Sequence, residues 1–523
     1  MLGLLENIEL LPKVFLILWI SFLFAALFLF QRQNKFWIWA LIASTFSIAS
    51  AFALFSPYLY TWDEQFHALV AKNGMSSPFH PKLFPHHPEA IPIPKDQWVL
   101  SGTWLHKQPF FTWLMALSMK IFGTSIFAVR LPSVLLFTAM IPAIYRIGYL
   151  LFSKRTGFIA SLLVMHSAYL LGLLSGRIGT DHNDAIFIAL ILFSFWAFFE
   201  WQCSNEKKWL YLIGVFVGFA VLTKWLVGLL VFFGWGILII REIYLQKKLR
   251  PIKPIMLSLV IAMILFIPWQ IYTLIKFPEL AKQEMGYNSQ HFTHVVEKHS
   301  GDASFHFDNI SNLYFEHTLF YIFILASILA FVFIRSEWKK LILIFLPVLV
   351  VYSFFSVAET KMPSFTAIVI PFVLLMFAFA IDMYTTFLHN KWVKIMSTIL
   401  IVLTTINLLI KPGQTLDAFG FKEGTKLYTV DKIMRHHQQF MEKQLVNNNK
   451  RIVFGCDWNR FAYISWMFYT NDIAYPFYPE KETIDKLLKE GFEIKLIDWN
   501  NSIPENLKED RRLTILHYNY EFS

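Results

Sequence analysis

Long apolar segments separated by short polar ones make up most of the chain. Twelve such segments can be counted, at about 11–30, 36–57, 127–150, 157–175, 185–201, 209–223, 225–240, 255–273, 314–334, 341–357, 365–386 and 395–410. A helix needs about 20 apolar residues to cross a bilayer, and most of these segments are that long. The pair 209–223 and 225–240 is shorter, so one re-entrant pair is an alternative to two spans. The pattern predicts an all-α polytopic membrane protein with about twelve transmembrane helices.

Two long polar loops and a polar tail interrupt this pattern. The loop 58–126 contains Phe110–Phe122, which is apolar but short and predicts a helix lying on the membrane surface. The second long loop is 274–313, and the tail 411–523 has a different composition. In the tail the expected strands are Ile452–Phe454, Glu493–Ile497 and Leu513–His517, and the expected helices are Ala462–Tyr469 and Thr483–Glu490. We therefore expect a transmembrane domain over 1–410 and a small α/β soluble domain over 411–523.

Composition supports the membrane assignment. The chain is 56% hydrophobic and only 16% charged, against roughly 25% charged residues in soluble domains. The net charge of +10 is typical of cytoplasmic loops that contact lipid phosphates, so nucleic acid is not an expected partner. The two cysteines, Cys203 and Cys456, are expected on opposite sides of the membrane and cannot pair. The first apolar segment is too long for a cleavable signal.

Basic residues fall in every second loop, which predicts the topology. These loops contain Arg32 and Lys35, Lys154 and Arg155, Lys207 and Lys208, Arg241 with Lys247 and Lys248, Arg335 with Lys339 and Lys340, and Lys391 with Lys394. By the positive-inside rule they face the cytoplasm, so both long loops and the tail face outward. We therefore expect a multi-pass membrane protein whose long loops and C-terminal domain are extracytoplasmic. The chain has no phosphate-binding G-x-x-x-x-G-K-[ST] loop, so an outward site needs a donor delivered through the membrane.

Two charged groups open and continue the first outward loop. Asp63 and Glu64 follow an apolar segment directly, and His106-Lys107-Gln108-Pro109 comes later. A charge beside the bilayer costs several kcal/mol unless it is partnered, so it is usually retained for function. The alternative is a helix end held at the interface by ordinary acidic side chains. We interpret the two groups as the ends of one reaction, a base and a cradle for a phosphate.

Several short motifs follow one another along the chain. They are Asp63-Glu64 after a helix, Lys107-x-Pro109, Phe122-Gly123, Phe127-Ala-Val-Arg130-Leu-Pro132-Ser133, Arg177-x-x-Thr180-Asp181, Leu222-Thr223-Lys224, Glu297-x-His299, and Lys361-Met-Pro363-Ser with Pro371. In this order they resemble the lipid-linked-sugar glycosyltransferases of the GT-C superfamily. These include the protein O-mannosyltransferases and, more closely, the bacterial aminoarabinose transferases that modify lipid A. The resemblance covers residues 36–386.

The chain departs from the family pattern at identifiable positions. An extra apolar segment, 11–30, precedes the family's first helix, and we count twelve spans where the family leads us to expect thirteen. The usual Lys-Pro-Pro is replaced by Lys107-Gln108-Pro109, and the Tyr expected after Asp-Glu is displaced by Gln65-Phe66-His67. These departures concern the identity of the substrate rather than the core chemistry.

The resemblance implies transfer of a sugar from a polyprenyl-phosphate donor, and the outward residues suit that chemistry. The phosphate leaving group needs cations, for which the candidates are Lys107, Lys361, Arg177 and Lys224. Each of them has the alternative of a solvated or snorkelling side chain. The acceptor hydroxyl needs a carboxylate base. Asp63 is the first choice for that base, with Glu64 as a helper or structural group and Asp181 orienting the sugar or sharing the base role.

Histidines are dense in the outward loops, so a metal site has to be considered. His291-x-x-His294 lacks matching third ligands, and no metal site or cofactor is predicted. A divalent cation near His106 and His299 stays an alternative. His106, Glu297 and His299 are otherwise expected to line the substrate loop, where His299 orients the phosphate or packs in the loop.

The sequence therefore predicts an inverting, membrane-embedded glycosyltransferase. It would move a sugar from a polyprenyl-phosphate carrier to a lipid, glycan or protein acceptor on the outer face of the inner membrane. The rival is a transporter or flippase of polyprenyl-linked glycan, which would need polar residues at mid-bilayer. Here nearly all of them lie at the outer edge. The tail 411–523 is expected to lie over the site without supplying chemistry.

Overall fold

The structure, a computed structural model, describes residues 9–91, 98–100, 102–179, 181–246, 252–333, 338–421, 424–445, 450–456, 461–499 and 501–518. It divides into two compact units, which we describe separately. The helical unit comprises Met1–Phe55, His106–Phe111 and Pro132–Ala418. The mixed unit comprises Ser56–Leu105, Thr112–Leu131 and Phe419–Ser523. The tail thus shares a unit with two pieces of the first long loop.

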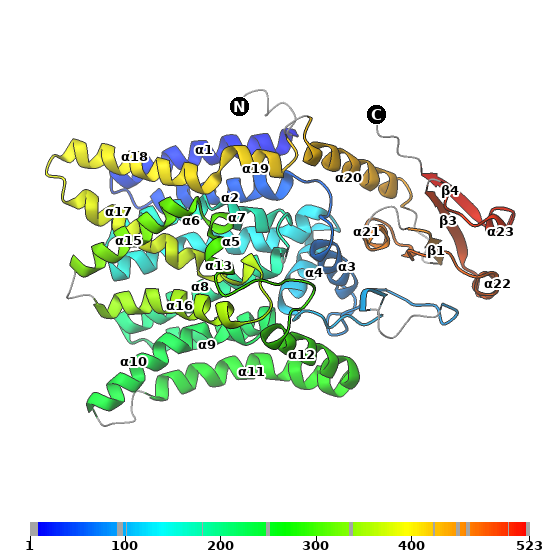
Figure 1. The fold of residues 1–523 in the computed structure, drawn as a ribbon, viewed down its shortest axis with the longest axis horizontal. Helices are drawn as coiled ribbons and strands as arrows, with labels where there is room; N and C mark the ends of the chain where they lie inside the picture. The colour runs from blue at the N-terminus through cyan, green and yellow to red at the C-terminus, as the bar shows by residue number, and fades with distance from the viewer. Residues whose placement is uncertain are drawn as a thin grey trace. The chain divides into compact units, whose positions relative to one another are not determined.

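The helical unit consists of long helices connected by short turns (Figure 1). The helices that lie wholly or mostly in it are α1 (Leu10–Gln31), α2 (Trp37–Leu54), α5 (Ile126–Leu151), α6 (Lys154–Met165), α7 (Ala168–Leu174), α8 (Asp181–Ser204), α9 (Lys207–Lys224), η3 (Trp225–Leu229), α10 (Leu230–Gln246), α11 (Ile252–Lys276), α12 (Pro278–Thr293), α13 (Phe305–Asp308), α14 (Ile310–Leu313), α15 (His317–Phe333), α16 (Trp338–Val357), η5 (Pro363–Phe365), η6 (Ala367–Val369), α17 (Ile370–Thr386), α18 (Lys391–Ile410) and α19 (Pro412–Ala418). Helices are the expected form because a lipid-embedded backbone has to satisfy its own hydrogen bonds.

Each of the twelve predicted apolar segments falls on helical structure, which confirms the all-α polytopic class. Within the described residues, eight helices are long and apolar enough to cross a membrane, or nine if the bent pair α6 and α7 is one span. The difference from twelve has two sources. The stretch Lys207–Leu245 counts as one span although it holds α9 and α10, and the apolar parts of α15 and α16 are shorter than 18 residues.

Small residues allow the closest helix packing in this unit. α9 lies beside α11 (Figure 1), and Gly214 and Gly218 of α9 face it. A Cβ at Gly214 would lie 2.6 Å from the carbonyl oxygen of Ser258, and one at Gly218 would lie 2.8 Å from the Cβ of Leu265. Close backbone approach through small residues is a common basis for helix association in membranes. The α9–α11 contact therefore depends on these two glycines.

The mixed unit is built around a four-stranded parallel sheet with strand order β2-β1-β3-β4. Its elements are α3 (Asp63–Gly74), η2 (Trp98–Leu100), α4 (Phe110–Phe122), α20 (Lys426–Glu442), β1 (Arg451–Phe454), α21 (Ala462–Tyr469), β2 (Ile473–Ala474), α22 (Lys481–Lys489), β3 (Glu493–Trp499), α23 (Glu505–Lys508) and β4 (Thr514–Tyr518). The first residues of α4 belong to the helical unit and the first residues of α5 to this one.

The predicted elements of the tail are confirmed. The three expected strands correspond to β1, β3 and β4, and the two expected helices to α21 and α22. Phe110–Phe122 is a helix with the bounds expected from the sequence, although its position on a membrane surface stays a prediction. Thr180 of the outward Arg177-x-x-Thr180-Asp181 motif lies outside the described residues.

The two cysteines offer a test of the predicted topology. Cys203 is exposed at the end of α8 and is expected in the cytoplasm, so a membrane-impermeant maleimide should leave it unlabelled in intact cells and label it after permeabilisation. Cys456 is buried and is not a suitable outward reporter. Glu505→Cys can serve instead, because the Glu505 side chain is 88% exposed, and it should label in intact cells. Labelling of Cys203 from outside would invert the topology.

Candidate functional site

Asp63 and Glu64 begin helix α3 in the mixed unit. Asp63 is half-buried, whereas Glu64 is 1% exposed. Asp63 occupies the first turn of α3, where the backbone N–H groups stabilise a carboxylate. The residue before it, Trp62, has a φ of 82°, which is strained for a bulky side chain. The carboxylate proposed from the sequence as a base therefore stands at a helix start, directly after a strained residue.

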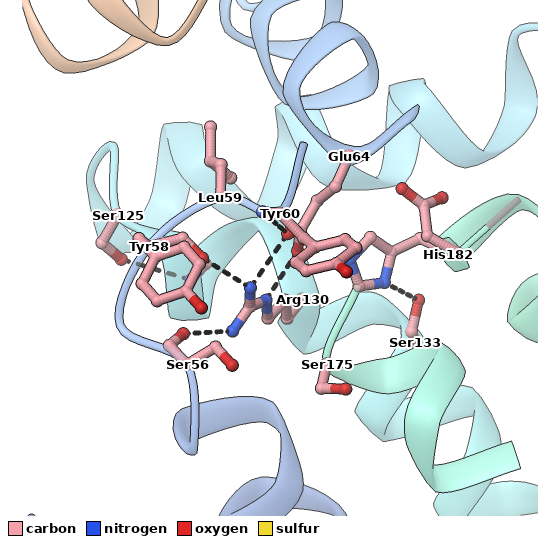
Figure 2. A network of polar contacts seen from close by, with 12 residues as sticks. Ser56, Tyr58, Leu59, Tyr60, Glu64, Ser125, Arg130, Ser133, Ser175 and His182 are labelled. Carbon is pink, nitrogen blue, oxygen red and sulfur yellow. Dashed lines mark hydrogen bonds and ion pairs between the residues drawn. The ribbon is translucent and has the colours of Figure 1, made fainter. Parts of the chain in front are cut away.

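Glu64 is held in a buried ion pair with Arg130 (Figure 2). Arg130 Nε donates to one carboxylate oxygen at 2.7 Å, and an Nη atom donates to the other at 2.9 Å. The remaining capacity is also used. Arg130 donates to the carbonyls of Ser56 and Tyr58, and the backbone N–H of Tyr60 donates to Glu64. With both side chains inaccessible and satisfied, Glu64 has a structural role here, which is one of the two roles expected for it.

A group of charged or polar side chains meets around α12 in the helical unit. We call it the His106 cluster, and its members are His106, Glu284, Tyr287, His291, Glu297 and His299. His106 Nδ1 lies 3.3 Å from Glu284 Oε2, and the rings of His106 and Tyr287 are 5.5 Å apart. Tyr287 donates to Glu297 at 2.8 Å, and His299 Nε2 lies 3.9 Å from the other oxygen of Glu297. The three residues expected to line the substrate loop are thus brought together by α12.

Lys107 lies within electrostatic range of this cluster. Burial lowers the pKa of the His291 imidazole, and the positive charge of Lys107 lowers it further. Burial also raises the pKa of Tyr287, with the hydrogen bond to Glu297 adding to the effect. His291 therefore stays neutral near neutral pH, and Lys107 contributes the fixed positive charge.

A second polar group occupies the start of α8. Asp181, His182, Asn183 and Asp184 are each no more than 2% exposed, although the next residues of α8, 185–193, are all apolar. Asp181 has a φ of 31°, and its carboxylate accepts from the backbone N–H of Asn183 at 3.3 Å. His182 Nδ1 lies 3.0 Å from the hydroxyl of Ser133 (Figure 2). Consecutive buried polar residues at the end of a membrane helix indicate a functional site.

Lys224 links this group to the His106 cluster. Its ammonium forms an ion pair with Asp184 and lies 5.7 Å from the centre of the Phe365 ring. That ring is 6.5 Å from the ring of His291. Lys224 thus lies beside Phe365, and the charge of Lys107 acts on the neighbouring His291, so two of the four cations expected to contact a donor phosphate are linked to one pair of rings.

The other two predicted cations have protein partners. Lys361 is 4% exposed, and its ammonium donates to the carbonyls of Phe355, Ser356 and Ala358 at the C-terminal end of α16. Its backbone N–H donates to the backbone carbonyl of His299 at 2.9 Å, so its main chain adjoins the cluster while its charge stabilises a helix end. Arg177 donates to the carbonyl of Ala418 at 3.2 Å. A phosphate role for either one stays a prediction, and for Lys361 it requires exchange of a carbonyl for phosphate.

No group of three or more His, Cys, Asp or Glu residues is arranged to hold a metal ion in the part of the chain that the structure describes. The divalent cation considered from the sequence is not tested by this.

Comparison with known proteins gives the fold and one family match. Residues 106–272 match the family model of dolichyl-phosphate-mannose-protein mannosyltransferase. No curated protein matches the sequence. ArnT from Cupriavidus metallidurans in the apo state is similar over 87% of this chain and 88% of that chain, with 13% identity and a TM-score of 0.59. The resemblance to the GT-C glycosyltransferases is confirmed.

Two ligand-bound structures have the same GT-C fold. ArnT bound to undecaprenyl phosphate is similar over 87% of this chain and 88% of that chain, with 14% identity and a TM-score of 0.57. The oligosaccharyltransferase AglB from Archaeoglobus fulgidus, in complex with an inhibitory peptide and a dolichol-phosphate, is similar over 84% of this chain and 65% of that chain. The identity is 11% and the TM-score 0.50.

Sequence reasoning missed several of these partners. From the sequence we did not group three residues of α12, namely Glu284, Tyr287 and His291, as one polar face. Their spacing of three and four residues places them on one face of a helix. Asp184 lies three residues after Asp181, so these two carboxylates also lie on one face of a helix. Arg130 was noted as a charge near a helix end, without its partner Glu64. Helical periodicity inside the polar loop would have found the first group.

The Glu64–Arg130 pair predicts a large effect on stability. Glu64→Gln leaves a buried guanidinium without its anion, so we expect a loss of about 3–5 kcal/mol. Asp63→Asn, one residue away and half-buried, should change stability by less than about 1 kcal/mol. Thermal unfolding in detergent, followed by intrinsic fluorescence, measures both. Equal melting temperatures for Glu64→Gln and wild type would show that the pair does not hold this unit together.

Proposed function

We propose that this protein is an inverting membrane glycosyltransferase that takes a sugar from a polyprenyl-phosphate donor. The observation that carries the proposal is that Lys224 lies beside Phe365 while Lys107 acts on His291, whose ring is 6.5 Å from that of Phe365, in a chain similar in fold to ArnT. Cations at the edge of apolar helices suit a lipid phosphate, because they neutralise the charge that develops on it as the sugar leaves. Binding of undecaprenyl phosphate by ArnT, which shares the fold, supports this donor class.

The donor phosphate is proposed to contact Lys107 first and Lys224 second. Lys107 is half-buried. Among the described residues, no acidic side chain forms a hydrogen bond or an ion pair with Lys107, so its positive charge can be used to bind a phosphate. Lys224 already pairs with Asp184, which holds the ammonium beside Phe365. Arg177 and Lys361 are supporting contacts in the proposal. Glu297 and His299 would border the same phosphate through the loop after α12.

The acceptor hydroxyl is proposed to lose its proton to Asp63, with Asp181 orienting the sugar. A hydroxyl is a poor nucleophile, and a positioned carboxylate that accepts its proton contributes roughly 10²–10⁴-fold to the rate. In one displacement the acceptor oxygen bonds to the anomeric carbon as the bond to the phosphate breaks. The configuration therefore inverts, and polyprenyl phosphate leaves. The acceptor is a lipid, glycan or protein on the outer face of the bacterial inner membrane.

A glycan transporter is the weaker alternative. It would need polar side chains in the middle of its spans. The buried polar residues of α8 instead gather at its start, from Asp181 to Asp184, residues 185–193 are apolar, and Glu200 lies near the other end, paired with Arg146. The distribution favours chemistry at one edge of the membrane over passage through it.

Replacing the proposed base tests the reaction. Membranes containing the protein are given radiolabelled undecaprenyl-phosphate glucose, mannose and aminoarabinose, and products are identified by mass. Asp63→Asn should lower transfer at least about 100-fold, because the amide cannot accept a proton, while undecaprenyl phosphate binding stays within about twofold of wild type. Transfer by Asp63→Asn at a near-wild-type rate would exclude Asp63 as the base.

Replacing the proposed phosphate contact tests the donor site. Lys107→Gln should weaken undecaprenyl phosphate binding by roughly 10- to 100-fold, the effect of losing a charge-assisted hydrogen bond. Lys282→Gln is the matched control, because Lys282 is an exposed lysine of α12 and its loss changes the net charge equally. Binding is measured by native mass spectrometry in detergent. Equal affinities for the two variants would mean that the phosphate does not contact Lys107.

A further inference from the structure

Helix α3 and the C-terminal region form one hydrophobic core. Buried side chains of the first loop, including Phe66, Leu69 and Val70 of α3, pack with those of β1, α21 and β3. α3 itself packs against α21. The region after residue 419 is therefore the support on which the helix that begins with Asp63 is built.

A buried polar contact joins the first turn of α3 to α21. Gln65 and Ser465 are 1% and 4% exposed, and Gln65 Nε2 donates to the Ser465 hydroxyl at 2.7 Å. The other end of the same amide, Oε1, accepts from the backbone N–H of Trp62 at 3.3 Å. Burying an amide costs free energy unless its hydrogen bonds are made, so both ends of Gln65 are fixed by their partners. The amide bridges α21 and the residue before Asp63.

The backbone around this bridge is strained on both sides. Trp62 has a φ of 82° and Phe461, which precedes α21, a φ of 64°. Their rings lie 4.7 Å apart. Left-handed backbone at bulky residues costs about 1–3 kcal/mol each and persists only where surrounding contacts enforce it. The contact between the two rings, together with the Gln65 bridge, enforces it here.

Further bonds tie the same stretch to the C-terminal region. The Tyr58 hydroxyl donates to Asp431, and the backbone N–H of Leu59 donates to the Tyr469 hydroxyl, both at 2.8 Å. At the other end of α3, the Lys72 ammonium donates to the carbonyls of Met467, Phe468 and Thr470, where α21 ends. Burial lowers the pKa of Lys72 to about 8, although the charge of Asp472 opposes this. α3 is thus fixed to α21 before, within and after its first turn.

We propose that Ser465, acting through Gln65 and Trp62, is a positioning residue that orients the Asp63 carboxylate for catalysis. The C-terminal region would then set the geometry of the base, although it supplies no reacting group. This inference rests on the proposed role of Asp63. Asp63 is partly accessible, whereas Glu64 and Gln65, which follow it, are buried. The backbone that carries the Asp63 carboxylate is therefore held in place by these two anchored neighbours. A base displaced by about 1 Å loses much of its effect.

The first test needs no substrate. Hydrogen–deuterium exchange of the full-length protein in detergent is compared for wild type, Ser465→Ala and Ser502→Ala. Ser502 is the matched control, since its hydroxyl also makes hydrogen bonds in this unit, to Tyr478 and to the N–H of Trp499, away from α3. Exchange in residues 60–66 should rise at least severalfold in Ser465→Ala and stay unchanged in Ser502→Ala. Unchanged exchange in Ser465→Ala would overturn the proposal.

The second test separates positioning from folding. With the undecaprenyl-phosphate sugar that gives product, Ser465→Ala should lower kcat about five- to tenfold, the effect of one hydrogen bond. The KM for donor should stay near wild type, and the protein should stay folded at the assay temperature, although its melting temperature should fall because the buried Gln65 amide loses a partner. Gln65→Met and the double variant Gln65→Met/Ser465→Ala should each lower kcat by the same factor as Ser465→Ala, because all three remove the same bridge. Independent effects would instead multiply the two factors in the double variant. A kcat equal to that of wild type would overturn the inference.

Asp63→Asn distinguishes this failure from a failure of the proposed function. If Asp63→Asn is inactive while Ser465→Ala is fully active, the base assignment stands and the positioning role is wrong. If Asp63→Asn is active, the proposed function fails first. In the Asp63→Asn background Ser465→Ala should cause no further loss of transfer, since there is no base left to orient.

Discussion

The ion pair between Arg130 and Glu64 is the interaction on which the mixed unit depends. A guanidinium with no solvent access is tolerable only if its donors are satisfied, and here they reach a carboxylate and two backbone carbonyls. The carbonyls belong to Ser56 and Tyr58, so the pair fixes the stretch leading into α3 as well as its first turn. Because Asp63 lies next to Glu64, fixing the Glu64 carboxylate also fixes the backbone that carries Asp63.

The same rule sorts the other charged residues. Lys361 and Lys72 each direct an ammonium at carbonyls where a helix ends, so their charges stabilise structure. Lys224 has an acidic partner and an aromatic ring, and Lys107 lies among histidines whose ionisation it affects. Charges that are already neutralised by the fold have little left for a ligand. Lys107 is therefore the cation most suited to a lipid phosphate, whereas Lys224 is already paired with Asp184.

Much of this could be predicted from the sequence, because the signals were local. Apolar length gave the twelve helical segments, and alternation and propensity gave β1, β3, β4, α21 and α22. Motif order led to the expectation that His106, Glu297 and His299 line one loop, and α12 brings these three together. What failed was contact across long separations. Arg130 lies 66 residues from Glu64, and Ser465 lies 400 residues from Gln65. Nothing local marks such pairs.

The shared core could not be foreseen for the same reason. The tail reads as a separate α/β domain, because its strands and helices alternate as in one. Its buried surface is nevertheless completed by Phe66, Leu83 and Trp104 of the first loop. Helix α3, which the sequence places at the start of a loop, contributes buried side chains to that core.

The most direct test of the account is a structure of the protein with undecaprenyl phosphate bound. The phosphate oxygens are expected within about 3 Å of the Lys107 ammonium, the distance of a charge-assisted hydrogen bond. The Lys224 ammonium is expected on the side of the Phe365 and His291 rings that is opposite to Lys107. A phosphate bound elsewhere, with Lys107 pointing into solvent, would contradict the account.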